Sequence, residues 1–365
     1  MSRRTFLLSS AAAAFAQAPN DRVGTAVIGT GNRGSYLLTS VIDQPDTRVA
    51  AICDLKPDRL DKAASAAGKD NPFTTKEWRR VIERKDVDAV YVATPPHLHA
   101  EMAVAALEAG KHVYCEKPIG VSARQVRDIV RAAKKSNKVF VAGQQMRSMS
   151  SLIAAVGKIH AGVIGEVYQI KAQRHATADL PHDGTSGDWY FDVSKSGGYL
   201  IEQSVHNLDL CNWAANMVPV KAVGFGSVMR YKGQPAGRTI FDNSSLVYEY
   251  SNGAKMTFTQ NVFHPRRLPN SNQMVYVYGE KGAADIMTTA SVYFHDTATK
   301  EEPLHTKPEE PKHAHTRMFF DLVKGTGTNR ADWKVGATAA LTAILGHEAM
   351  TRQRVVTMAE LGVEL

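Results

Sequence analysis

The sequence predicts an α/β protein of two domains, an N-terminal doubly wound parallel sheet followed by an α+β domain built on a large, mostly antiparallel sheet. The chain has 365 residues, which is more than one hydrophobic core usually organises. From Val23, short β-rich runs alternate with amphipathic stretches, as in βαβ units. Beyond about residue 150, longer alternating runs indicate antiparallel strands.

The composition is that of a globular protein. Hydrophobic residues make up 44% and charged residues 22% of the chain, which excludes disordered, collagen-like and coiled-coil classes. Cys53, Cys115 and Cys211 are too few for a disulfide scaffold and lack the spacing of a zinc site. The net charge of +8 is dispersed, with doublets such as Lys134-Lys135 in place of a basic stripe. We therefore expect no nucleic-acid partner.

The first eighteen residues have the order of an export signal. Arg3-Arg4 precedes an apolar stretch from Leu8 to Phe15, and Ala16-Gln17-Ala18 has the A-x-A form of a cleavage site. The paired arginines look like a twin-arginine signal, and the apolar stretch is far shorter than the roughly 20 residues that span a bilayer. We expect residues 1–18 to be a signal peptide of a periplasmic protein without a stable membrane anchor; the alternative is a frayed basic terminus.

Residues 19–145 are expected to form the parallel-sheet domain. Its predicted strands are Val23–Ile28, Val49–Cys53, Ala89–Val92, His112–Tyr114 and Val139–Ala142. Its predicted helices are Tyr36–Ile42, Arg59–Ala66, Ala100–Ala109 and Ala123–Lys135.

Residues 146–365 are expected to form the α+β domain. Helices are predicted at Ser151–His160 and near Tyr199–Trp213, followed by strands at Ser245–Tyr250, Ala254–Asn261 and Gln273–Tyr278. Asn252-Gly253 is a strong hairpin signal between the first two strands. Thr297–Lys312 reads as a surface loop. Two late helices, Thr316–Lys324 and Val335–Met350, would close the structure and pack back on the first domain.

A glycine motif predicts a dinucleotide site. Gly29 to Gly34 fits G-x-G-x-x-G, ends an apolar strand and opens a helix. In such a motif Gly29 permits the tight turn, Gly31 lets the backbone approach the pyrophosphate, and Gly34 allows close packing of helix on strand. Free N–H groups at the helix start, around Asn32, would receive the phosphates.

The acidic residue that follows favours NAD over NADP. Asp54 lies twenty residues after Gly34, at the end of the next strand. Its carboxylate would accept hydrogen bonds from the ribose hydroxyls and repel a 2′-phosphate. Arg33 keeps NADP as the second choice, since a guanidinium can hold a phosphate.

Four further segments resemble the Gfo/Idh/MocA oxidoreductases, the family of glucose–fructose oxidoreductase and inositol dehydrogenase. They match the family's T-P-N-x-x-H, E-K-P, G-G-G-x-x-x-D-x-x-x-H-x-x-D and late G-x-x-G patterns, and they are Ala93–His99, Glu116–Pro118, Ser196–Asp209 and Tyr278–Ala283. The resemblance covers essentially all of the chain after residue 18. It implies an NAD-dependent oxidoreductase that acts on a hydroxyl of a sugar or polyol-like substrate.

The resemblance also assigns residues around the nicotinamide. Lys117 would lie beside that ring and contact the substrate hydroxyl, and a cis Lys117–Pro118 bond is typical of the family. Thr94, Pro95, His99 and Glu116 would line the coenzyme. His97 and His99 form an H-x-H pair, but no third ligand is visible nearby, so we predict no metal.

His206 is the expected general acid/base. A neutral imidazole suits removal of an alcohol proton near neutral pH. Glu202 precedes it by four residues, so both are expected on one helix face directed at the same site. Glu202 stands where the family usually carries Asp, which leaves the substrate class open.

Four more residues are candidates for the substrate. Trp189 and Tyr190 precede the glycine run, where aromatic rings stack on sugar faces, although core packing is an equal alternative. Arg147 lies just past the last parallel strand and is either a substrate ligand or an interdomain ion-pair partner. Asp209 lies on the same helix face as His206 and either contacts substrate or only orients it.

Export combined with a nucleotide site suggests tightly bound NAD that is regenerated within each turnover. One reaction class oxidises a sugar and then reduces a second carbonyl. A second is an NAD-dependent glycoside hydrolase or lyase that acts through transient C3 oxidation and elimination. A third reading is a non-catalytic sugar or nucleotide-binding protein. The resemblance implies a homodimer or homotetramer assembled through the C-terminal sheet.

Overall fold

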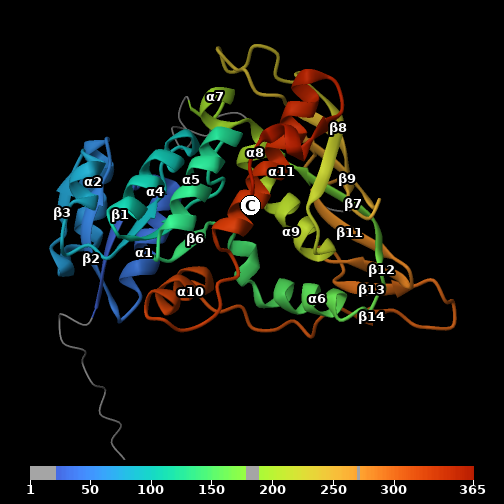
Figure 1. Ribbon diagram of the computed structural model, residues 1–365, viewed down its shortest axis with the longest axis horizontal. Coiled ribbons are helices and arrows are strands. Elements are labelled where there is room, and N and C mark those ends of the chain that lie inside the picture. Colours follow the sequence, from blue (N-terminus) through green and yellow to red (C-terminus); the bar gives the residue numbers. More distant parts are fainter. Residues whose placement is uncertain (1–21, 178–188, 269–271) are drawn as a thin grey trace, which may run out of the picture.

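A computed structural model describes residues 22–177, 189–268 and 272–365. The expected signal peptide, residues 1–18, lies outside the described residues. Two sheets dominate the molecule, and helices fill the space between them (Figure 1).

The N-terminal sheet is parallel and six-stranded, in the order β3-β2-β1-β4-β5-β6. Its sequence order reverses between β1 and β4, and ligands bind at the carboxyl ends of strands at such a switch point. This confirms the predicted doubly wound sheet, with one additional strand, β3. The strands are β1 Val23–Ile28, β2 Thr47–Cys53, β3 Phe73–Thr75, β4 Ala89–Val92, β5 His112–Cys115 and β6 Phe140–Ala142.

Helices cover both faces of this sheet. They are α1 Asn32–Ile42, α2 Pro57–Ala66, α3 Trp78–Ile82, α4 His99–Glu108 and α5 Ala123–Lys135, with short 3-10 turns η2 Gly68–Asp70, η3 Pro96–Leu98 and η4 Gln145–Ser148. A late helix, α10 Ala314–Val323, also packs here: Phe319 and Phe320 lie in one hydrophobic cluster with Tyr91 and Tyr114. Tyr91 stacks on Tyr114 with 4.6 Å between ring centroids, and Phe319 meets Tyr91 edge-on at 5.3 Å.

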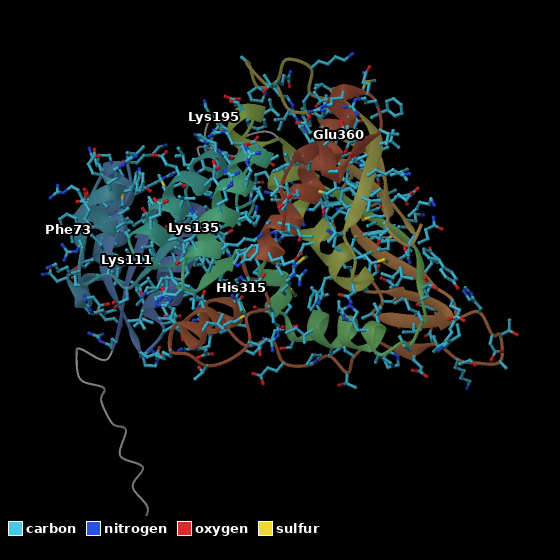
Figure 2. The ribbon with its side chains drawn as sticks, viewed as in Figure 1. Phe73, Lys111, Lys135, Lys195, His315 and Glu360 are labelled. Atoms are coloured by element: carbon cyan, nitrogen blue, oxygen red, sulfur yellow. The ribbon has the colours of Figure 1, made fainter. Side chains whose placement is uncertain are left out.

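His315 links α10 to the end of the parallel sheet through hydrogen bonds of its ring. Its Nε2 lies 2.9 Å from the carbonyl oxygen of Ala142, at the end of β6, and its Nδ1 lies 2.7 Å from the Ser148 hydroxyl in η4. Figure 2 labels His315 beside the junction of the two halves of the molecule. Burial lowers the pKa of His315 to about 4, so the ring is neutral at physiological pH.

The C-terminal sheet has nine strands in the order β14-β13-β12-β11-β7-β10-β9-β8-β15. Its strands pair antiparallel except β10 with β7, as expected for a mostly antiparallel sheet. The strands are β7 Val167–His175, β8 Pro219–Ser227, β9 Asn243–Tyr250, β10 Lys255–Asn261, β11 Gln273–Gly279, β12 Gly282–Asp285, β13 Ser291–Phe294, β14 Glu302–Pro303 and β15 Val356–Thr357.

One face of this sheet packs on helices and the other is open (Figure 1). The long helix α11 contacts β8 on one side and β6 and α5 on the other, so it joins the two sheets. The helices are α6 Ser150–His160, α7 Val193–Ser196, α8 Tyr199–Glu202, α9 Val205–Ala215 and α11 Trp333–Arg352, and the chain ends with a 3-10 turn, η5 Met358–Leu361. Within the described part of the chain, no helix combines the length and apolarity needed to cross a bilayer.

Two local predictions were wrong. The helix expected near Tyr199–Trp213 is two helices, α8 and α9, because the N–H groups of Gln203 and Ser204 both bond to the Tyr199 carbonyl, at 2.9 and 3.1 Å, and interrupt the regular ladder. Glu202 and His206 therefore do not share one helix face. The expected surface loop Thr297–Lys312 contains strand β14, and Leu304 beside it is buried because it packs into the main core.

Candidate active site

The glycine loop after β1 leaves a helix start open to a ligand. Gly29 has φ of 86°, and a Cβ on Gly34 would lie 1.8 Å from the Gly29 carbonyl oxygen, so both glycines are needed for the turn itself. A Cβ on Gly31 would approach only the Arg59 guanidinium, at 3.1 Å. Gly31 is the N-cap of α1 and no side chain caps the helix. The free N–H groups at Asn32 and beyond therefore fit a pyrophosphate.

Asp54 lies at the end of β2, beside this loop. Its Oδ2 accepts from the N–H of Thr30 at 2.7 Å and the Thr30 hydroxyl at 3.0 Å, and its Oδ1 accepts from the N–H of Lys56 at 2.9 Å. These bonds hold the carboxylate where a ribose would lie in a dinucleotide fold. The negative charge there fits NAD and disfavours a 2′-phosphate.

Arg33 is directed along the sheet toward the end of β5. Its Nε lies 2.6 Å from Oε1 of Glu116, and its Nη2 lies 2.8 Å from Oε1 of Gln145. Burial opposes the charge of Arg33, but Glu116 outweighs it and raises the pKa of Arg33. Because this guanidinium already has a carboxylate, it is not a free ligand for a 2′-phosphate, which removes the reason for keeping NADP.

His99 joins the loops that follow β4 and β5. It starts α4, and its two ring nitrogens lie 2.7 Å from the carbonyl oxygens of Thr94 and Pro118. The ring is buried, and burial lowers its pKa. His99 therefore acts on the coenzyme site by holding Thr94, Pro95 and the Lys117–Pro118 segment in place.

Lys117 and Glu202 meet at the carboxyl end of the parallel sheet. The Lys117 Nζ lies 2.9 Å from Oε1 of Glu202 and 2.7 Å from its backbone carbonyl oxygen. The Lys117–Pro118 bond is cis. The Gln203 amide donates to the other Glu202 oxygen. Both charged side chains are largely buried, so the pair holds the ammonium in one position.

His206 lies beside this pair with one nitrogen available. Its Nδ1 lies 3.1 Å from Oε1 of Gln144, two residues after the end of β6. Since that oxygen only accepts, Nδ1–H donates and Nε2 keeps its lone pair. Burial, with the charges of Lys117 and Arg174, lowers the pKa of His206 well below its usual value. The ring is a neutral base at neutral pH.

Two of the predicted substrate ligands bind each other. Arg147 Nε and Nη2 lie 2.8 Å from the two carboxylate oxygens of Asp209, and the guanidinium stacks over Trp213. Asp209 is buried, and burial raises its pKa against the effect of Arg147. The pair joins η4 to α9 and lies within residues 146–365, so it is not an interdomain contact, and each side chain is already bound to the other.

Tyr190 lies at the edge of a small hydrophobic cluster, and Trp189 contacts the Tyr190 ring. Their rings meet edge-on, 5.8 Å apart, and Tyr190 packs against the cluster of Tyr199, Tyr231 and Val262. Both side chains are half-buried, which agrees with the packing alternative.

Sequence reasoning missed several amide side chains and one arginine around His206. Gln144 was detectable because it lies two residues after a predicted strand, Val139–Ala142. Arg174, at the end of β7, bonds to Gln203 and to residues of α9 and β11, namely Asn207 and Gln273. Its strand was not predicted, so nothing in the sequence pointed to it.

Comparison with known proteins agrees with this geometry. Residues 23–144 match the description "Oxidoreductase family, NAD-binding Rossmann fold", and residues 153–285 match the "GFO/IDH/MocA C-terminal domain". The chain is 33% identical over 189 residues to a glycosyl hydrolase family 109 protein of Stenotrophomonas maltophilia, covering 47% of this chain and 42% of that one. It is 25% identical over 262 residues to myo-inositol 2-dehydrogenase of Thermotoga maritima, covering 72% and 73%.

A solved structure of levoglucosan dehydrogenase with NADH and levoglucosan has the same fold, with a TM-score of 0.78 and 22% identity over 92% of this chain and 99% of that one. The match to the glycosyl hydrolase relative spans less than half of that protein's length. The two matched regions together take in the parallel sheet, strands β7 to β12 of the second sheet, and the residues Lys117, Glu202 and His206. The chain belongs to the Gfo/Idh/MocA oxidoreductase family.

Proposed function

We propose that the protein is an NAD-dependent oxidoreductase that oxidises a hydroxyl of a sugar or polyol-like substrate. The observation that carries this is the convergence of the Lys117 ammonium and the free Nε2 of His206 at the carboxyl end of the parallel sheet, beside the glycine loop. The relative named myo-inositol 2-dehydrogenase supports a polyol substrate.

The residues divide the work as follows. Gly31, the start of α1 and Asp54 hold the dinucleotide, and bound NAD supplies the hydride acceptor. Lys117, held by Glu202, donates a hydrogen bond to the oxygen of the reacting hydroxyl. Nε2 of His206 takes the hydroxyl proton, while the Nδ1–H bond to Gln144 supports the imidazolium that forms. In the reverse direction His206 returns the proton to the carbonyl oxygen.

Export through a twin-arginine signal in residues 1–18 is part of this proposal. Such a route carries folded protein, so NAD can be bound before export and must then be recycled within the turnover. Replacing Arg3-Arg4 by Lys-Lys should keep the protein in the cytoplasm, whereas replacement of Lys134-Lys135 by Arg-Arg should leave export unchanged. Equal export of both variants would contradict the signal.

A redox-neutral glycoside hydrolase or lyase is the second candidate. The relative named as a glycosyl hydrolase family 109 protein favours it. In that reaction transient oxidation of a ring carbon acidifies the neighbouring C–H, the glycosidic bond is eliminated, water adds, and the ketone is reduced again. The bound cofactor would return to its starting state without a second carbonyl substrate.

We also propose a homodimer or homotetramer formed through the open face of the C-terminal sheet. Large apolar side chains lie exposed on this face, and they come from β7, β8, β9 and β13: Tyr168, Val223, Phe225, Val247 and Tyr293. Phe225 alone is 72% exposed, Val223 lies opposite Val247 in the register of β8 with β9, and exposed apolar side chains that gather on one face are typical of an interface. Phe225→Glu should shift the mass measured by light scattering to that of a monomer.

One experiment tests the activity. Denatured protein should release NAD, identified by absorbance and mass. Native protein is then given free sugars or aryl glycosides. NADH absorbance that rises with a sugar and falls with a second carbonyl supports the oxidoreductase, and aglycone release without NADH supports the hydrolase. A protein without bound NAD that requires millimolar additions would contradict the closed cycle.

A further inference from the structure

Arg174 is a cation beside His206 that no carboxylate of the described residues neutralises. It projects from β7 on the same face as Ile170 and Ala172, which are buried toward the helices. Its guanidinium bonds only to amide oxygens: Gln203 at 3.1 Å, Gln273 at 2.7 Å and Asn207 at 3.3 Å. Its charge reaches His206, whose pKa it helps to lower.

The other cations of the site have carboxylate partners. Lys117 pairs with Glu202, Arg33 with Glu116, and Arg147 with Asp209. Among the described residues, the cluster around His206 therefore carries one uncompensated positive charge, that of Arg174. A half-buried guanidinium without a counter-charge is costly to keep unless a ligand provides the charge.

Some N–H donors of Arg174 also have no acceptor in the part of the chain that the structure describes. A guanidinium has five N–H groups, and the three amide oxygens leave the Nε–H and one N–H of Nη2. Gln260 stands opposite Arg174 in the register of β10 with β7. Its side chain is buried, its oxygen accepts from Ser244, and its Nε2 has no partner among the described residues. The adjacent strands β7 and β10 thus place two N–H groups of Arg174 beside the Gln260 amide group, and none of these donors has an acceptor among the described residues.

We propose that Arg174, assisted by Gln260, binds a carboxylate of the substrate, so that the protein acts on an acidic sugar or sugar acid. This rests on the proposed function, because it assigns the oxidised hydroxyl of the same molecule to Lys117 and His206. A carboxylate matches the two remaining N–H groups, as Asp209 matches Nε and Nη2 of Arg147. One free cation balances a monoanion and falls short of a dianionic phosphate.

The test compares matched ligand pairs on NAD-loaded protein. Glucuronate with glucose, and galacturonate with galactose, differ only in the carboxylate, and binding measured by calorimetry does not depend on turnover. At least one acid should bind about tenfold or more tightly than its neutral partner, since a charge-assisted hydrogen bond is of that strength. Its methyl ester should bind like the neutral sugar. The preference should weaken with added salt.

Substitutions of Arg174 test whether this residue causes the tighter binding of the acid. Arg174→Met should bring the affinity for the acid to that of the neutral sugar, and Arg174→Lys should keep part of the preference. Lys171→Met, an exposed cation on the same strand but the opposite face, is the matched control and should change neither affinity. NAD content and melting temperature verify that each variant is folded, and the methyl ester comparison requires no variant.

The outcomes separate this inference from the proposed function. Acids that bind no tighter than their neutral partners, while a sugar still reduces bound NAD, overturn the inference alone. Arg174-dependent binding of acids without reduction of NAD supports the carboxylate site and overturns the oxidoreductase. Tighter binding of glucose 6-phosphate than of glucuronate overturns the assignment to a carboxylate.

Discussion

Lys117 contacts Glu202 twice, through the carboxylate at 2.9 Å and the backbone carbonyl at 2.7 Å. Glu202 thus both balances the charge of the Lys117 ammonium with its carboxylate and fixes the orientation of that ammonium with its two oxygen acceptors. Glu202 ends α8 just before the break at Gln203–Ser204, so its carbonyl is free of a regular helix bond and available to Lys117. The irregularity that the periodicity did not reveal is what brings Glu202 into the site.

Replacing Lys117 by Met should lower kcat by about 10²- to 10⁴-fold, the usual contribution of a group that stabilises the reacting oxygen. NAD content should stay unchanged, because the glycine loop and Asp54 hold the dinucleotide. Lys135→Met, on the exposed end of α5 (Figure 2), is the control and should leave kcat unchanged. A Lys117→Met protein with full kcat would contradict the role of Lys117.

The pH profile should show no loss of activity around the ordinary pKa of histidine. Because burial and the neighbouring cations lower the pKa of His206 well below 6.5, the free base persists as the pH falls through that value, and the rate declines only at lower pH. The measurement is kcat/KM over a pH series. An acid limb with an apparent pKa of 6.5 or higher would contradict it, and His206→Asn should lose about 10²-fold or more at every pH.

Two glycines of one motif should respond differently to alanine. Gly31→Ala meets only the movable end of Arg59, so the protein should fold normally, but the new methyl group occupies the approach of the pyrophosphate and NAD content should fall. Gly34→Ala places a Cβ 1.8 Å from the Gly29 carbonyl oxygen and should lower the melting temperature. Equal melting temperatures for the two variants would contradict this distinction.

His315 should make the fold sensitive to acid. Its pKa is about 4 in the folded protein and about 6.5 in the unfolded chain. The unfolded state therefore binds the proton more readily, so the contribution of His315 is complete above pH 6.5 and is lost as the pH falls toward 4. The free energy of unfolding lost in this way amounts to about 3 kcal/mol.

Urea unfolding at several pH values between these limits measures the slope of the free energy of unfolding against pH. His315→Gln should flatten this slope. A slope that is the same with and without His315 would contradict the assignment. The slope has the stated sign because burial disfavours the charged form of the His315 ring in the folded protein.

The sequence predicted those parts of the site that lie on local motifs. Gly29 to Gly34, Asp54 and Lys117 each follow a strand of the parallel sheet, and strand ends of a doubly wound fold meet at one edge. β3 was missed because it has only three residues and no alternation. Pairings between residues far apart in the chain could not be predicted either. The sequence allowed Arg147 and Asp209 to contact a ligand, and only the structure shows that they bind each other.

Arg174 shows a second limit of sequence reasoning. Charged residues usually indicate an exposed face, and in β7 Lys171 and Arg174 look alike in the sequence. Only the pairing of β7 with β10 and β11 shows that Arg174 faces the helices and Lys171 does not. Its partners are amides from three separate elements, which no spacing rule connects.

The position of α10 has a consequence for how the protein can be divided or recombined. Phe319 and Phe320, which follow strands β7 to β14 in the chain, complete the cluster around Tyr91 and Tyr114. A fragment ending near residue 145 would expose those tyrosine rings and would be prone to aggregation. A chimera that exchanges the nucleotide-binding half between relatives must therefore carry its own α10, so the interchangeable module is discontinuous in sequence.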